Sequence, residues 1–164
     1  MVLEYARHVA GIAGAQTTEV APHCAEPVID LLPDQEGVHD KGGTMRLGAY
    51  PCRLTDGSRA AEIYGRDMVF ERHRHRWEFN NAYRERLETA GLTCSGTYEK
   101  QNLVEVVELS DRNFFLGVQY HPEFKSKPLE PHPLFQAFIG AALARRGEAE
   151  DSAVEEPQRA GVNA

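Results

Sequence analysis

The chain has 164 residues, of which 41% are hydrophobic, and this length and composition predict one globular domain with a hydrophobic core. Acidic residues outnumber basic ones 25 to 18, giving a net charge of −7, so nucleic acid is not a predicted partner. No apolar run approaches the roughly 18 residues that span a bilayer, and no secretory signal is recognisable, so a cytoplasmic location without membrane contact is expected.

The three cysteines, Cys24, Cys52 and Cys94, are scattered without CxxC spacing. This argues against a disulfide framework and against a zinc ribbon, and predicts three reduced thiols. None of them stands in a glycine-flanked turn of the kind that exposes a nucleophile. A catalytic thiol is therefore not predicted within this sequence.

The amino-terminal part predicts a helix followed by strands. Residues 2–12 place small and apolar side chains on one helical face, with no capping residue before them. Residues 20–43 have the prolines of a loop-rich connector, with one short strand or turn at 28–32. Residues 44–54 alternate as a strand, in which Pro51 marks an edge or a bulge.

The middle of the chain predicts a strand followed by a helix. Residues 68–80 alternate in the same way as the preceding strand. Asn81 is placed to cap a helix over residues 82–90, and Gly91 ends it.

The carboxyl-terminal part predicts three strands and a helix. The strands cover residues 92–98, 103–109 and 113–120, and the second is apolar on most of both faces, as in a covered sheet. A wide apolar stripe predicts a helix over 133–147, and the polar, acidic residues 148–164 predict a disordered tail. This mixture favours an α/β fold with a sheet covered by helices.

A histidine and a glutamate follow the last predicted strand. In an extended segment His121 and Glu123 project to the same side, while Pro122 points away and stiffens the backbone. A carboxylate beside an imidazole fixes its tautomer, which suits a general base that serves a nucleophile. The alternative is a surface ion pair at a turn. A metal site is a poorer interpretation, because no third and fourth ligands stand at suitable spacing.

Residues 71–81, ERHRHRWEFNN, form a strongly basic stretch. If the segment is extended, one face carries Arg72, Arg74 and Arg76. The other face carries His73, His75 and Trp77. An arginine binds a carboxylate or phosphate through paired hydrogen bonds, so a small anionic ligand is one interpretation, and a structural network with internal acids is the other.

The chain resembles the carboxyl-terminal glutamine amidotransferase domain of CTP synthases in five segments: EYARHVAG, KGGTMRLGAYPCRL, ERHRHRWEFNN, LVEVVEL and GVQYHPEFKSKPLEPHPLFQAF. These segments run in order from about residue 1 to residue 146. HPEF alone is shared by many class I amidotransferases, whereas the combination is far more specific. The resemblance implies a class I glutamine amidotransferase-like, flavodoxin-like fold.

The resemblance implies hydrolysis of glutamine by a Cys–His–Glu triad, in which a thiolate attacks the side-chain amide, forms a glutamyl thioester and releases ammonia. His121 is implied as the base and Glu123 as the acid that orients it. Glu19 resembles the acidic residue that holds the substrate amino group, and Arg76 resembles the arginine that holds the substrate carboxylate. Glutamine is a zwitterion, so one acidic and one basic anchor complement it.

The resemblance also implies partners beyond this chain. In the family, ammonia passes to a separate synthetase domain, where ATP and magnesium activate UTP and CTP is formed. No cofactor is therefore expected on this chain, since ATP and magnesium belong to the synthetase domain, and GTP is the usual effector. The expected partners are glutamine and either that synthetase domain or an amino-terminal half.

The sequence departs from the family at the nucleophile. The family's cysteine lies on a G-I-C-L-G-M-Q elbow, and EYARHVAG lies on the helix that follows the elbow. We therefore expect residues 1–147 to be an amino-terminally truncated amidotransferase domain, followed by the disordered tail 148–164, without glutaminase activity alone. A non-catalytic module for glutamine binding or subunit interaction is the alternative function. An amidotransferase for another acceptor, such as GMP or carbamoyl phosphate synthesis, fits the motifs less well.

Overall fold

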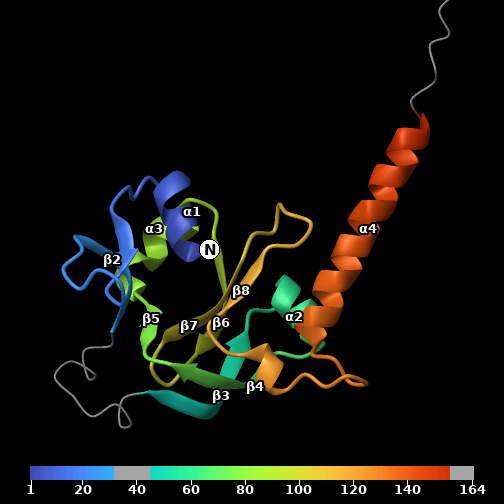
Figure 1. Ribbon diagram of the computed structural model, residues 1–164. Helices are drawn as coiled ribbons and strands as arrows, with labels where there is room; N and C mark the ends of the chain where they lie inside the picture. The colour runs from blue at the N-terminus through green and yellow to red at the C-terminus, as the bar shows by residue number, and fades with distance from the viewer. Residues whose placement is uncertain (32–44, 156–164) are drawn as a thin grey trace, which may run out of the picture.

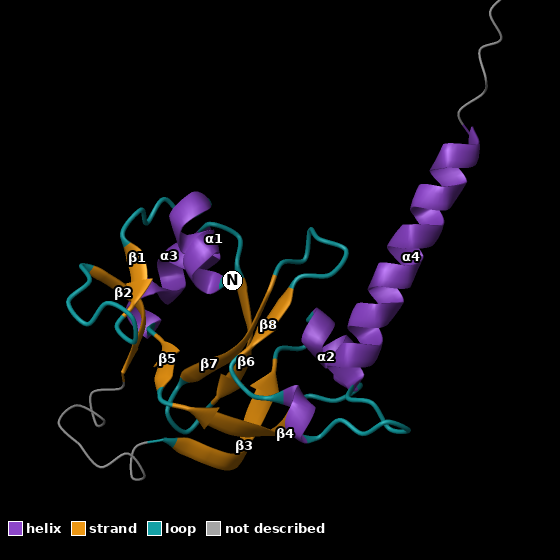
Figure 2. Cartoon of the chain, in the orientation of Figure 1, coloured by secondary structure: helices purple, strands orange, loops and turns teal. Residues whose placement is uncertain are grey.

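The computed structural model describes residues 1–31 and 45–155, with side chains described through residue 147 (Figure 1, Figure 2). Its strands form two sheets. The smaller sheet has the order β1-β2-β5, with β1 Ala15–Thr17, β2 Glu26–Leu31 and β5 Trp77–Phe79. The larger sheet has the order β4-β3-β6-β7-β8, with β3 Arg46–Leu54, β4 Met68–His75, β6 Thr93–Tyr98, β7 Leu103–Glu108 and β8 Leu116–Val118.

The helices lie around these sheets. They are α1 Val2–His8, α2 Arg59–Tyr64, α3 Arg84–Thr89 and α4 Pro133–Glu155, with the 3-10 turns η2 Asn81–Tyr83 and η3 Pro122–Phe124. Strand β1 pairs with β2 in parallel, whereas β2 with β5 and the pairs of the larger sheet are antiparallel. Among the described helices, none is both long enough and apolar enough to cross a membrane.

The predicted mixture of helices and strands is confirmed, and most predicted strands are present. The described parts of 28–32 and 44–54 form β2 and β3, and the predicted strands 92–98 and 103–109 form β6 and β7. All six residues of β7 are buried, as the apolar run on both faces indicates. The third of these runs forms the shorter strand β8, which covers three residues.

One predicted strand is wrong in its extent. Residues 68–80 form two strands, because β4 pairs with β3 in the larger sheet and β5 pairs with β2 in the smaller one. Arg76 lies at the break between them. Strand β4 alternates between buried and exposed residues, whereas Glu78 and Phe79 of β5 are both buried. The residue types on either side of the break are similar, so the sequence carries no sign that the chain changes sheets.

Several helix boundaries differ from those predicted. Helix α1 ends at His8 and does not continue to residue 12. The cap before η2 is Asn80 rather than Asn81, since the Asn80 side chain accepts a hydrogen bond from Ala82 N–H (3.0 Å). Helix α4 continues to Glu155 and does not end at Gly147, so the predicted tail begins too early, and residues 156–164 lie outside the described residues. A single glycine inside a helix, such as Gly147, lowers helix stability by about 1 kcal/mol relative to alanine, but it ends the helix only where it takes the left-handed conformation.

Helix α2 was not predicted, although its sequence has both end signals. The Ser58 side chain accepts a hydrogen bond from Ala61 N–H, and Gly65 takes the left-handed conformation after the last turn. Its six residues are too few to show a helical period. The helix packs against the first turns of α4, whose remainder projects away from the sheets (Figure 1).

The hydrophobic core has two clusters, and β7 contributes to both. Val104 and Val107 pack in the cluster beneath α1 and α3, whereas Val106 packs with residues of β3, α2 and α4. Opposite Val106 stands Gly96 in β6, where a Cβ atom would lie 2.5 Å from Val106 Cγ2 and 2.8 Å from Cys52 Sγ. The packing of β6 on β7 therefore requires glycine at this position.

We expect Gly96→Ala to lower the free energy of unfolding by about 1–3 kcal/mol, because the added methyl group overpacks the core. Gly140→Ala on α4 is the control, since a Cβ there meets nothing within 4 Å. Its effect is expected to be slightly stabilising, at up to about 1 kcal/mol, through helix propensity. Urea unfolding followed by circular dichroism measures the free energy of unfolding of both variants. Equal stability of the two variants would contradict the packing argument.

Candidate functional site

His121 and Glu123, called the imidazole–carboxylate pair below, lie in contact after β8. His121 Nδ1 donates a hydrogen bond to Glu123 Oε1 at 2.7 Å, and this bond lowers the pKa of Glu123. The predicted contact is present, but the predicted extended backbone is wrong, because the residues form the start of the 3-10 turn η3. The turn brings i and i+2 side chains together, while Pro122 supplies a fixed φ at its first position.

Glu19 and Arg76, the two predicted anchors for glutamine, line one cavity of about 520 Å³. The other lining residues are Ile29, Met45, Arg74, His75 and Trp77. Glu19 is exposed in the turn after β1, where its N–H donates to Thr17 Oγ1 (3.2 Å). Arg76 is half-buried, and its Nη2 has no hydrogen-bond partner among the described residues. Arg74 and Arg76 both line the cavity, and their positive charge favours an anionic ligand there.

The arginines of the basic stretch do not act as one group. Arg72 and Arg74 lie on the exposed face of β4, and His73 is buried on the other face, as alternation predicts. Arg76 follows the end of β4, at the crossing to β5, so its side chain is placed by a turn rather than by the strand. The structure therefore separates Arg76 from Arg72.

A chain of hydrogen bonds between histidines holds this crossing. His75 Nδ1–H donates to the Trp77 carbonyl (3.0 Å), and His73 Nδ1–H donates to His75 Nε2 (2.8 Å). Burial, together with the charge of Arg46, lowers the pKa of His73 to about 3 and that of His75 to about 4. Both rings are therefore neutral near pH 7, and each has a defined tautomer.

A buried cluster of charged residues, Arg46, Glu78 and Glu105, lies next to His73 and His75. Arg46 Nη1, on β3, is 2.7 Å from Glu105 Oε1 on β7 and 3.3 Å from Glu78 Oε1 on β5. The Gln119 amide donates to the other oxygen of Glu78 (2.8 Å). Burial raises the pKa of Glu78 to about 7 and also raises that of Glu105. One guanidinium thus holds two carboxyl groups and joins the two sheets beside the Arg76 turn.

The imidazole–carboxylate pair lies near the cavity of Glu19 and Arg76 but does not line it. The His121 N–H donates to the Arg72 carbonyl (2.8 Å), so the pair is held along β4, whose end carries the cavity. The charge of His121 is one of the causes that lower the pKa of His75, which lines the cavity. The structure therefore places all four predicted site residues around β4 and its crossing to β5.

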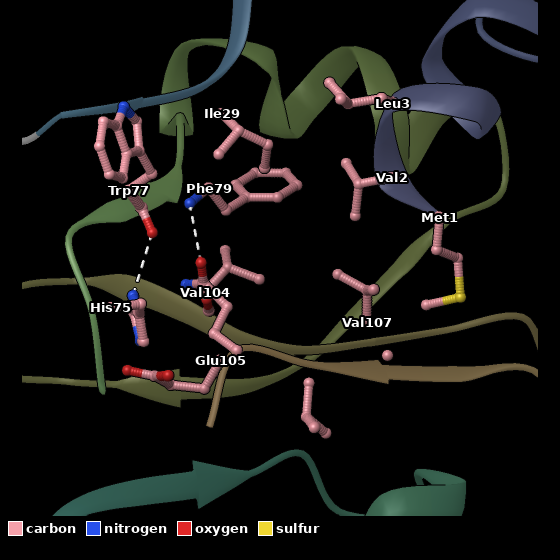
Figure 3. A pocket seen from close by; sticks show the side chains of 13 residues that line it. Met1, Val2, Leu3, Ile29, His75, Trp77, Phe79, Val104, Glu105 and Val107 are labelled. Carbon is pink, nitrogen blue, oxygen red and sulfur yellow. Dashed lines mark hydrogen bonds between the residues drawn. The ribbon is translucent and has the colours of Figure 1, made fainter. Parts of the chain in front are cut away.

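A second cavity, of about 390 Å³, lies between α1 and strands β5 and β7. His75 and Trp77 line both cavities. In Figure 3, Met1 and Val2 of α1 stand at one end of this cavity, and His75 and Trp77 stand at the other. Most of its lining is apolar, and it adjoins the cavity of Arg76 at His75 and Trp77.

The three cysteines are free, and none forms a hydrogen bond with His121 among the described contacts. Cys52 is fully buried and Cys94 nearly so, and burial raises the pKa of each thiol to about 12. Cys24 is half-buried in the turn before β2. The two buried thiols are therefore protonated at neutral pH and unsuited to nucleophilic attack.

Comparison with known proteins identifies the family. The model of the family "Glutamine amidotransferase class-I" matches residues 1–141. A CTP synthase of Geobacter metallireducens is 59% identical over 147 residues, which are 90% of this chain and 27% of the relative. A CTP synthase of Thermomicrobium roseum is 56% identical over 158 residues, 95% of this chain and 28% of the relative. The chain thus spans about a quarter of the length of these relatives.

A solved structure shows the same fold. The glutaminase domain of Trypanosoma brucei CTPS with bound acivicin superimposes with a TM-score of 0.79 at 37% sequence identity. The match covers 87% of this chain and 56% of that one. Together with the family match, it confirms the predicted class I amidotransferase fold.

We expect His73 and His75 to remain neutral in the folded protein at about pH 5.5, and to titrate near pH 6.5 in concentrated urea. Their lowered pKa values mean that the unfolded chain binds protons that the folded chain does not. Their contribution to stability is therefore complete above about pH 6.5 and is lost as the pH falls. Ring carbon chemical shifts, assigned with His73→Gln and His75→Gln, measure this, and titration of either ring near pH 6.5 in the folded protein would contradict it.

Proposed function

Because the chain belongs to the class I glutamine amidotransferase family, we propose that it forms the glutamine-binding and proton-transferring part of the glutaminase domain of a CTP synthase. The observation that carries this proposal is the cavity shared by Glu19 and Arg76, together with the attachment of the imidazole–carboxylate pair to β4, the strand that leads to this cavity. No other pair of predicted anchors in the described residues offers opposite charges to one small ligand.

Free glutamine is a zwitterion, and the cavity offers a site for each of its charges. The guanidinium of Arg76, which lines the cavity, would donate to the substrate carboxylate. The exposed carboxylate of Glu19 is placed to accept from the substrate ammonium group. These contacts would leave the side-chain amide of glutamine free for reaction.

In the proposed reaction the imidazole moves a proton. The hydrogen bond from His121 Nδ1 to Glu123 leaves Nε2 with a lone pair, so Nε2 accepts the proton of a thiol. The thiolate attacks the amide carbon, and the C–N bond breaks as the imidazolium returns the proton to the departing nitrogen, releasing ammonia. Water then hydrolyses the thioester, with the imidazole again as base. Glu123 stabilises the imidazolium in each step.

The thiol of this reaction is proposed to come from outside the residues of this chain. The buried, protonated thiols of Cys52 and Cys94 support this, as does the lack of a described contact between Cys24 and His121. The chain by itself then binds glutamine without hydrolysing it. For the isolated chain, this coincides with the alternative function of a non-catalytic glutamine-binding module.

The later steps are proposed to occur in the part of the relatives that this chain does not match. There the ammonia would aminate UTP to CTP in an ATP-dependent reaction, with magnesium, and GTP would act as effector. Among the described residues, no group of three or more His, Cys, Asp or Glu side chains is arranged to hold a metal ion. The synthetase domain is accordingly the proposed partner.

We expect calorimetry to detect binding of L-glutamine to the chain, and Arg76→Met to weaken it by at least about tenfold, because a charge-assisted hydrogen bond is lost. Glu19→Gln is expected to act in the same direction. The matched control is Arg112→Met, since Arg112 is exposed and pairs with its neighbour Asp111. Absence of binding by the unchanged chain would disprove the proposal, and equal binding by Arg76→Met would remove Arg76 from the site.

We expect the chain alone to release ammonia from glutamine at the background rate, because the thiols of Cys52 and Cys94 are buried and protonated. A coupled ammonia assay measures this rate. Cys24→Ser provides the decisive comparison, since Cys24 is the most accessible of the three cysteines. A rate above background that disappears in Cys24→Ser would show that the chain contains its own nucleophile.

A further inference from the structure

Residues 119–132, the connecting segment between β8 and α4, carry the imidazole–carboxylate pair along the edge of β4. Two hydrogen bonds attach the connecting segment to this strand. The His121 N–H donates to the Arg72 carbonyl (2.8 Å), and Lys125 Nζ donates to the Phe70 carbonyl (2.7 Å). One attachment is at the first residue of the pair and the other is two residues after the pair, and their acceptors lie on either side of one buried residue of β4.

That residue is Glu71, whose side chain is almost completely buried. Three donors converge on its Oε1 atom: Lys125 Nζ at 3.0 Å, His132 Nε2 at 3.1 Å and the Tyr64 hydroxyl at 3.2 Å. Oε2 has no hydrogen-bond partner among the described residues. Lys125 supplies the positive charge next to the carboxylate, which a buried charge requires. Glu71 therefore depends on the connecting segment as much as the segment depends on it.

The directions of these hydrogen bonds follow from their partners. Leu134 N–H donates to His132 Nδ1 (3.3 Å), so the His132 hydrogen is on Nε2 and points toward Glu71. The Tyr64 hydroxyl, which donates to Glu71, also lies 3.1 Å from the Tyr120 hydroxyl, which donates to it. The network thus runs from Glu71 to Tyr120, the residue directly before the pair, and to Lys125, two residues after it.

The pair needs such external anchors. Its side chains are 34% and 55% exposed, and an exposed ion pair contributes little to holding its own geometry. The ring of His121 stacks on Phe124 (5.0 Å between centroids), but both belong to the same turn and move together. Attachment of the chain before and after the pair to one rigid strand restricts the backbone that carries both side chains.

We propose that Glu71 is a positioning residue, which holds the imidazole–carboxylate pair in register with β4 through Lys125, His132 and the two tyrosine hydroxyls. This inference rests on the proposed function, in which His121 is the base. Glu71 touches neither substrate nor the reacting atoms. It anchors the connecting segment to β4. This role also explains why Lys125 and His132, which take no part in the proposed reaction, both donate hydrogen bonds to Glu71.

The test is Glu71→Gln, which keeps the size of the side chain and removes the charge that faces Lys125. We expect the His121 amide hydrogen to exchange about tenfold faster, because the segment detaches more often from the Arg72 carbonyl. We also expect the pKa of the Glu123 carboxyl to rise, because its hydrogen bond with His121 is made less often. Hydrogen exchange and carboxyl carbon chemical shifts measure these effects without substrate.

Glu108→Gln is the matched control. Glu108 is also buried, and its carboxylate accepts hydrogen bonds from Arg59 N–H, Ala60 N–H and the Ser95 hydroxyl, outside the connecting segment. It is expected to lower the thermal midpoint while leaving His121 exchange and the Glu123 pKa unchanged. If Glu71→Gln behaved in the same way, Glu71 would be structural alone and the proposal would be overturned.

If Glu71→Gln does not fold, Lys125→Met provides the same test from the exposed side of the network. We expect it to speed exchange of the His121 amide, and Lys127→Met, at an exposed lysine paired with Glu130, to leave it unchanged. Unchanged exchange in Lys125→Met would overturn the proposal. These measurements use no glutamine. A failure of the chain to bind glutamine would therefore disprove the proposed function without deciding whether Glu71 positions the pair.

Discussion

The arrangement of the site depends on the buried ion pairs that Arg46 forms with Glu78 and Glu105. Arg46 holds Glu105 of the larger sheet and Glu78 of the smaller sheet, and so fixes the two sheets where the chain crosses from β4 to β5. Arg76 lies at that crossing, and its direction follows from the position of both strands. A buried cluster with one cation and two carboxyl groups is costly unless it is closely packed, so it tolerates little displacement.

Burial also decides which of these groups carry protons. It raises the pKa of Glu78 to about 7 and lowers those of His73 and His75 to about 3 and 4. Folding thus favours the neutral form of His73 and His75 and the protonated form of Glu78. The cluster carries less net charge than its residue types suggest, and Arg76 supplies positive charge to the cavity that it lines.

Strand β4 serves the site on both of its faces. Its buried face carries Glu71 and His73, which hold the connecting segment and the crossing to β5. Its exposed face carries Arg72, whose carbonyl accepts the His121 N–H, and Arg74, which lines the cavity. The pair and the cavity are therefore set by one strand, and displacement of β4 would move both together.

The sequence by itself determined the family, most strands and the contact between His121 and Glu123, because these are local patterns or distinctive motifs. The four site residues stay a prediction from the same motifs. The sequence did not determine that residues 68–80 divide between two sheets, since the residue types are similar in both. Nor did it indicate that Glu71 and Arg46 face partners far along the chain. Only the tertiary structure decided these contacts, because they join residues whose separation in sequence carries no periodic signal.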